Sequence, residues 1–166
     1  NPSSWSVSFG GKPLFVARSK EGNAQPITVR PAVGYHPDPN YAGYMVYFGT
    51  GKYIEASDNA STGQPTQDFY GLWDKWEKGT STAFTAFTRA NLVMQEILSE
   101  TGGVRVDTDN PVDWATKQGW YLDLIVKGAA SNQGERVITE PVLRGGSVLF
   151  TTLIPATAIC EFGGTG

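Results

Sequence analysis

The stretch Gly-Thr-Gly-Lys at positions 49–52 follows an apolar run and has the composition of a loop that holds a nucleotide phosphate. Such a loop needs the pattern G-x-x-x-x-G-K-[ST] and a helix whose amino end faces the phosphate. Here the position five before Gly51 is Val46, and Lys52 is followed by Tyr53, which cannot replace the magnesium-binding hydroxyl. We therefore predict no phosphate site. The glycines are expected to permit a bend or bulge where a buried strand leaves its sheet.

Histidine and cysteine are too scarce to suggest a catalytic network. His36 is the one histidine and lies among turn residues, so no Ser-His-Asp or Cys-His constellation is apparent, and we expect a surface turn there. Cys160 is the one cysteine and cannot form a disulfide within these residues. A reactive thiol, a bridge to a cysteine outside these residues and a small buried side chain all stay open for it. We predict no catalytic and no cofactor-binding residue.

The acidic stretch "DTDNPVD" at 107–113 offers the oxygens of Asp107, Asp109, Asn110 and Asp113 for a calcium loop. Proline holds its fifth position, no glycine stands at the sixth, and no bidentate glutamate closes it. We therefore expect an Asx-turn with solvated acids and predict no metal ligand. The triplet at 59–61 fits a glycosylation sequon, which is a short and common pattern.

Aromatic side chains could instead form a platform for a sugar. Strand alternation places Trp120 and Phe150 in the core, whereas Tyr70, Trp73 and Trp76 stay open as platform candidates.

The composition indicates many short strands joined by turns. Charged residues are 17% and aromatic residues 12% of the 166, with 20 glycines and 10 prolines. The net charge of -3 gives no electrostatic reason to expect nucleic acid or an anionic membrane surface as a partner. No run of 18 apolar residues exists, so no membrane-spanning segment is predicted. Both ends of the sequence look like the interior of a longer protein, and we expect an excised or processed piece.

These residues must be positioned by β-strands, and the chain is predicted to be all-β. The segment 119–126 should place Trp120, Leu122, Leu124 and Val126 on one face, with Tyr121 and Asp123 opposite. The segment 84–100 fits helical spacing in part, but residues 92–109 also fit two strands around Thr101-Gly102-Gly103, and we prefer this hairpin. Other strands are expected at 12–19, 25–35, 44–54, 68–76 and, as a hairpin, 135–155; polar loops are expected at 55–67 and 127–134.

A weak internal repeat relates the segments around Pro31 and Pro141, which are 141 − 31 = 110 positions apart. A compact propeller blade takes about 40–50 residues. We therefore predict one blade with a long insertion at about 76–118, or else a chance similarity of two buried strands.

Several blocks of the sequence resemble a known family when they are taken in order. The blocks "VYFGTGKY", "GWYLDL" and "RGGSVLFTTLIP" are specific in combination, and "PLFVARSKEGNAQPITVRPAVGYHP", "FYGLWD" and "VRVDTDNPVDW" extend the match along nearly the whole chain. They strongly resemble the carboxy-terminal region of the PilY/PilC-type type IV pilus tip adhesins.

The resemblance implies that residues 1–166 are a fragment of a C-terminal modified beta-propeller, a partial propeller of antiparallel blades. It implies a structural and adhesive module at the pilus tip or outer membrane of a bacterium, supporting surface adhesion, pilus biogenesis and twitching motility. The implied partners are minor pilins, a host or abiotic surface, and the rest of the parent propeller.

Two details of the family bear on single residues here. Family members bind calcium at a D-x-D-x-N-x-D-G motif, from which 107–113 departs at its fifth and later positions, so no calcium ligand is carried over. Cys160 matches a cysteine position of relatives, which implies a bridge to a partner outside these residues.

The resemblance favours a protein that is not an enzyme. A quinone-dependent dehydrogenase would also use a propeller, but it would show regular blade repeats with tryptophan docking motifs, which do not appear here. A carbohydrate-binding module that uses Tyr70, Trp73 and Trp76 is the other alternative.

Overall fold

The computed structural model describes residues 8–75 and 85–156. In these residues the regular structure consists of β-strands and short 3₁₀ turns, without an α-helix, so the all-β prediction is confirmed. None of the helical segments found in the described part is long and apolar enough to cross a membrane. Trp76 and Cys160 lie outside the described residues.

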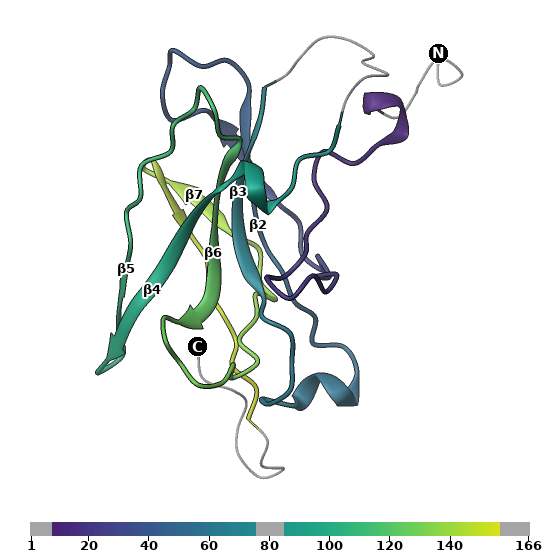
Figure 1. Cartoon of the computed structure of the whole chain (residues 1–166), viewed down its shortest axis with the longest axis vertical. Helices are drawn as coiled ribbons and strands as arrows, with labels where there is room; N and C mark the ends of the chain where they lie inside the picture. Colours follow the sequence, from purple (N-terminus) through teal and green to yellow (C-terminus); the bar gives the residue numbers. More distant parts are fainter. Residues whose placement is uncertain (1–7, 76–84, 157–166) are drawn as a thin grey trace.

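Six strands form one curled sheet in the order β1-β2-β3-β6-β4-β5, and two more form the separate hairpin β7–β8 (Figure 1). The main sheet consists of β1 (Ala32–Tyr35), β2 (Tyr44–Gly49), β3 (Asp68–Asp74), β6 (Gly119–Val126), β4 (Val93–Thr101) and β5 (Val104–Asp107). The hairpin consists of β7 (Val142–Arg144) and β8 (Ser147–Leu149), and the 3₁₀ turns are η2 (Ser8–Gly11), η3 (Ala56–Asn59) and η4 (Arg89–Asn91).

The strand pairing departs from a purely antiparallel sheet at one place. The β4–β6 pair is parallel, and every other pair of neighbouring strands is antiparallel. Parallel neighbours need a long crossover connection. The β5 strand and residues 108–118 supply it, because they carry the chain back before β6 begins.

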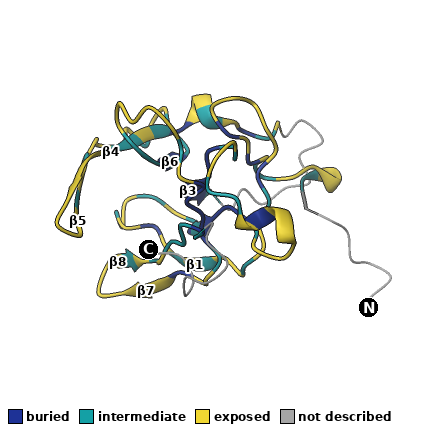
Figure 2. Ribbon diagram, turned by 90° about the horizontal axis from the view of Figure 1, so that it is seen from below, coloured by how far each residue is buried: buried dark blue, intermediate teal, exposed yellow. Residues whose placement is uncertain are grey.

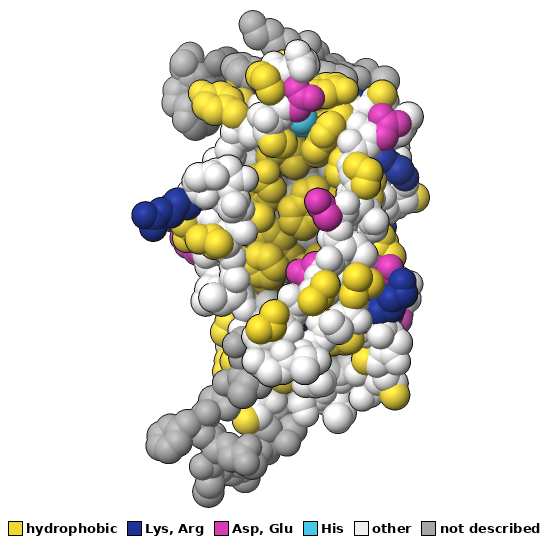
Figure 3. Space-filling model, turned by 90° about the vertical axis from the view of Figure 1, so that its left-hand side faces the viewer, with side chains coloured by type: hydrophobic (Ala, Val, Ile, Leu, Met, Phe, Trp, Pro, Cys, Tyr) yellow, Lys and Arg dark blue, Asp and Glu magenta, His cyan; other side chains and the backbone are white. Residues whose placement is uncertain are grey.

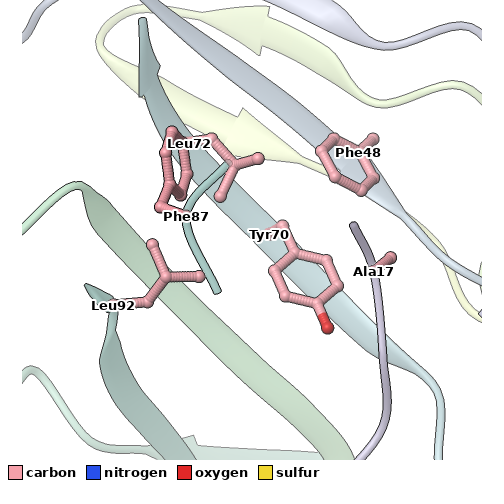
Figure 4. Packing of buried hydrophobic residues seen from close by; sticks show 6 residues of the cluster. All are labelled: Ala17, Phe48, Tyr70, Leu72, Phe87 and Leu92. Atoms are coloured by element: carbon pink, nitrogen blue, oxygen red, sulfur yellow. The ribbon is translucent and has the colours of Figure 1, made fainter. Parts of the chain in front are cut away.

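Alternation along β6 divides the core between the two faces of the sheet, as predicted. On one face, which we call face A, Tyr121 packs against a cluster formed by Ala17, Phe48, Tyr70, Leu72, Phe87 and Leu92, shown in Figure 4. On the opposite face, face B, Trp120 and Val126 pack against a cluster formed by Phe69, Ile97, Leu122, Leu124 and Val137. The strand β3 contributes to both clusters and is buried along almost its whole length.

The sheet curls so that it leaves an opening. Seen from below in Figure 2, the β4–β5 hairpin lies on one side of this opening and the β7–β8 hairpin on the other. The β7 strand contacts β1, so the hairpin continues the curve beyond that end of the sheet. The result is a half-barrel whose inner surface is face B.

The two predicted hairpins are present, and one predicted strand is not. Gly102-Gly103 joins β4 to β5, and Gly145-Gly146 joins β7 to β8. The segment 12–19 forms only isolated bridges, because it crosses face A and places Leu14, Phe15 and Ala17 in the core. The strand predicted at 25–35 is confined to β1. The described part of 76–118 supplies β4 and β5 to the main sheet, and its status as an insertion stays a prediction.

Candidate functional site: an apolar groove

Face B is hollowed by an apolar groove, visible as the central hydrophobic area in Figure 3. Its volume is about 430 Å³, and its floor includes Trp120 and Leu122 of β6 together with Phe150. The loop that follows β5 lines it as well, with Trp114, Pro111 and Val112 among its apolar members. A concave, mostly apolar surface of this size is typical of a site that binds another molecule or another segment of protein.

The charges at the groove are of one sign. Asp107 and Asp109 line it, and among the described lining residues there is no lysine or arginine. The groove therefore offers apolar contact along its floor and carboxylates at its edge. Its described lining is therefore suited to hold a ligand by apolar contact and by charge.

Hydrogen bonds to β4 hold the 107–113 loop in place beside the groove. Gln95 Nε2 donates to the Asn110 carbonyl at 2.8 Å, and the Asn110 backbone N–H donates back to Gln95 Oε1 at 2.9 Å. The Asn110 side chain also donates to the Met94 carbonyl at 2.8 Å. Asp113 accepts from the backbone N–H of Ala115 at 3.1 Å, which is the predicted Asx-turn. Within the described residues, no three His, Cys, Asp or Glu side chains are grouped as metal ligands.

Sequence analysis did not identify the polar cluster that is buried on face A. Asp68 of β3 accepts hydrogen bonds from Tyr70 Oη at 2.6 Å and from Gln25 Nε2 at 2.8 Å, and it forms an ion pair with Arg89. Arg89 also donates to Asp123 Oδ1 at 2.5 Å, and its guanidinium lies over the Tyr121 ring. The sequence signal that could have revealed this cluster is an aspartate in each of two apolar strands, Asp68 in β3 and Asp123 in β6.

The cluster changes the ionisation of its members. Burial raises the pKa of the Asp68 carboxyl to about 7, and the carboxylate of Asp123 adds to this rise although the Arg89 cation opposes it. Burial also opposes the charge of Arg89, but the two aspartates outweigh it and raise the pKa of the guanidinium. Burial, together with Asp68, raises the pKa of the Tyr70 hydroxyl. We interpret the cluster as a clamp that holds η4 on the sheet, because Arg89 begins that turn.

The Gly-Thr-Gly-Lys stretch passes between neighbouring segments, in agreement with its predicted structural role. The Gly51 N–H donates to the Pro26 carbonyl, and the Val137 N–H donates to the Thr50 carbonyl, both at 2.9 Å. A Cβ atom at Gly49 would lie 2.2 Å from the Cβ of Val137, so only glycine fits this close approach. Lys52 Nζ forms ion pairs with Glu55 at 3.0 Å and Asp58 at 3.3 Å.

The prediction that His36 lies on the surface of a turn is wrong. Its residue is only 7% exposed, because the rings of Tyr41, Trp73 and Trp114 surround it. Its Nδ1 accepts from the Asp38 backbone N–H at 3.1 Å, which fixes the ring within the turn. The neighbouring aromatic residues are distant in sequence, so the turn signals around His36 could not reveal this burial.

The aromatic platform candidates are also buried where they are described. Tyr70 is 0% and Trp73 is 6% exposed, and Trp73 Nε1 donates to the Ala42 carbonyl at 2.9 Å. Trp120 and Phe150, which were predicted to lie in the core, pack against the face B cluster and are half-buried on the floor of the groove.

The described strands form an all-β, curled sheet that carries an apolar groove on its inner face. Residues 1–109 match the family model of the PilY1 beta-propeller domain. The chain belongs to this family, which confirms the resemblance found in the sequence, and its fold is part of a beta-propeller.

Two relatives and one solved structure give the extent of the similarity. The type IV pilus biogenesis factor PilY1 of Pseudomonas aeruginosa strain PAO1 is 39% identical over 97% of this chain and 15% of its own length. A PilY1 homolog of Xylella fastidiosa strain Temecula1 is 36% identical over 99% of this chain and 11% of its own length. The crystal structure of the P. aeruginosa PilY1 C-terminal domain superposes with a TM-score of 0.81 and 36% identity, covering 92% of this chain and 33% of that one. The chain thus spans a small part of these relatives.

Proposed function

We propose that this chain is a structural and adhesive module of a type IV pilus tip protein. In this role it supports pilus biogenesis, surface adhesion and twitching motility, at the pilus tip or outer membrane of a bacterium. The observation that carries the proposal is the similarity to type IV pilus biogenesis factors along nearly the whole chain. The proposed partners are minor pilins, a host or abiotic surface, and the remainder of a propeller.

A non-catalytic role fits the chemistry of the described side chains. His36 is enclosed by aromatic rings, Lys52 is held in ion pairs, and the buried Asp68 is tied to Arg89. The groove that remains accessible is lined by apolar and acidic side chains suited to contact. We propose that it works without a cofactor of its own.

A sugar-binding role through Tyr70, Trp73 and Trp76 has less support. A sugar stacks on an exposed ring, and the first two of these rings are buried. Trp76 lies outside the described residues.

The proposal is tested by removing this region from its natural gene in the bacterium of origin. We expect bacteria that carry the gene without this region to form few surface pili and small twitching zones, although pilin is still made. The intact gene should restore both. As a matched control, Ile54→Ser at an exposed loop position should behave like the intact gene. Normal pili, twitching and attachment in the excised strain would refute the proposed role.

A further inference from the structure

We propose that a β-strand from outside these 166 residues, contributed by the same protein, pairs with the free edge of β5 and lies along the groove toward β7–β8. The inference rests on the proposed function, because it assumes that this sheet is part of a larger propeller. The free edge of β5 and the groove would be the surface through which this sheet joins the remainder of the propeller.

The first observation is an edge strand without a second neighbour. In the part of the chain that the structure describes, β5 pairs with β4 and with no other strand. Exposed edges attract further strands unless charges or prolines protect them. The charged side chain in the middle of β5, Arg105, is held by Glu135, from Nη2 at 2.9 Å, and by Glu100, from Nε at 3.0 Å. It is therefore paired rather than projecting beyond the edge.

The second observation is apolar surface on one face of this edge and the groove beside the other. Val104 and Val106 are two positions apart and share one face of β5, where they are 65% and 51% exposed. Asp107 is directed to the groove, whose floor includes Trp120 and Phe150. An added strand would direct alternate side chains to the two faces. One set would cover the valines, and the other set would enter the groove.

This arrangement indicates the kind of segment that fits. A strand that is covered on both faces is typical of a domain interior, and permanent interfaces are more apolar than transient ones. The occupant should therefore be a buried strand of the same domain rather than a briefly bound partner. Asp107 and Asp109 line the groove, so the strand should carry a lysine or arginine at that end.

The solved relative shows that such a protein has residues to supply the strand. This chain superposes on 33% of the P. aeruginosa PilY1 C-terminal domain, with a TM-score of 0.81. The remaining two thirds of that relative's chain have no counterpart in these residues, and a corresponding part of this protein would be the source.

The test introduces an aspartate at Val106 in the whole protein that carries these residues. If the added strand covers Val106, Val106→Asp should lower the Tm by about 3 °C or more, because it buries an unpaired charge. The matched control is Val33→Asp on β1. Val33 is 58% exposed and faces away from the groove. This variant should change the Tm by less than about 1 °C. Equal, small shifts for both variants would overturn the proposal.

A second measurement does not depend on the aspartate variant folding. Cysteines placed by Val106→Cys and Val33→Cys are treated with a maleimide, and labelling at each site is followed by mass spectrometry. We expect Val106→Cys to react at least about tenfold more slowly, because the added strand buries it. Equal labelling rates would overturn the proposal.

Other occupants give other results. If a second copy filled the groove, light scattering would show a dimer of the whole protein, and Val106→Asp would convert it to a monomer. This result would contradict the proposal that the strand comes from the same protein. Both measurements use purified protein and do not depend on pili. If position 106 proves accessible in the purified protein while the bacterium still needs this region for pili, the added strand is refuted and the proposed function stands.

Discussion

At the scale of single residues, the buried Asp68–Arg89–Asp123 cluster couples ionisation to stability. Two carboxylates share one guanidinium, so the ion-paired cluster carries a net negative charge inside face A. Within the described residues, Oδ1 of Asp68 is buried and has no hydrogen-bond partner. Burial of a charge without full compensation favours the neutral acid. The cluster should therefore make stability depend on pH.

We predict that stability falls as the pH rises from about 4 to about 7. The pKa of Asp68 is raised to about 7 in the folded protein, whereas an unfolded aspartate titrates near 3.9. The folded state thus binds more protons across this window, and their loss at higher pH removes stability. The Tm should fall by roughly 5 °C between pH 5 and pH 8, measured by circular dichroism.

Asp68→Asn provides the comparison for this pH dependence, because its amide keeps an acceptor for Tyr70 and Gln25 but cannot ionise. Its Tm should vary little over the same range. Asp113→Asn, at an exposed turn, should retain the wild-type slope. A full slope in Asp68→Asn would show that another group is responsible.

Residue-scale features were the least predictable from the sequence. Arg89 reaches partners 21 and 34 positions away, and no local pattern indicates such a contact. His36 was misjudged for the same reason, since the aromatic rings that bury it come from distant segments. By contrast, the Asx-turn at Asp113 was predictable because its bonds are local.

At the scale of elements, the end of β2 is a place where two segments approach closely. Gly49 pairs with Phe69 of β3 and lies against the fully buried side chain of Val137. Gly49 does not adopt a left-handed backbone conformation, so glycine is required there only because a side chain would have no space. This contact joins β2 to the segment that leads into the β7–β8 hairpin.

We predict that Gly49→Ala lowers the free energy of unfolding by about 1–3 kcal/mol, because the new methyl group overlaps a packed side chain. Gly34→Ala on β1 is the matched control. There the added atom would lie 2.8 Å from Cδ1 of Leu143, the end of a flexible and partly exposed side chain that can move. Its cost should stay below about 0.5 kcal/mol. Urea unfolding of both variants measures the difference, and equal costs would contradict the packing described.

Strands were predictable where a period of two coincided with burial. The 119–126 pattern correctly divided Trp120 and Leu122 from Tyr121, because side chains must alternate along a strand. The segment 12–19 has a similar apolar content, but it covers face A and forms only isolated bridges. Apolar content indicates that a segment is buried and does not decide whether it joins a ladder.

At the scale of the whole molecule, the two faces of the sheet differ in how they are covered. Face A is covered by the segments around Phe15 and Phe87 and is clamped by Arg89. Face B is covered in part by the segment 137–150, and the rest is the open groove. The curl of the sheet and its opening follow from long-range pairing, so the sequence predicted the strands but not this shape.

Hydrogen–deuterium exchange of the whole protein, resolved by segment, tests the central claim most directly. We predict the slowest exchange in β3, which has neighbours on both sides and is buried on both faces. The amides of β5 that point away from β4 should exchange at least about a hundredfold more slowly than those of the loop at 127–134, because a strand covers their free edge. Exchange of these amides at the rate of that loop would contradict the account, since the edge and the groove beside it would then be open to water.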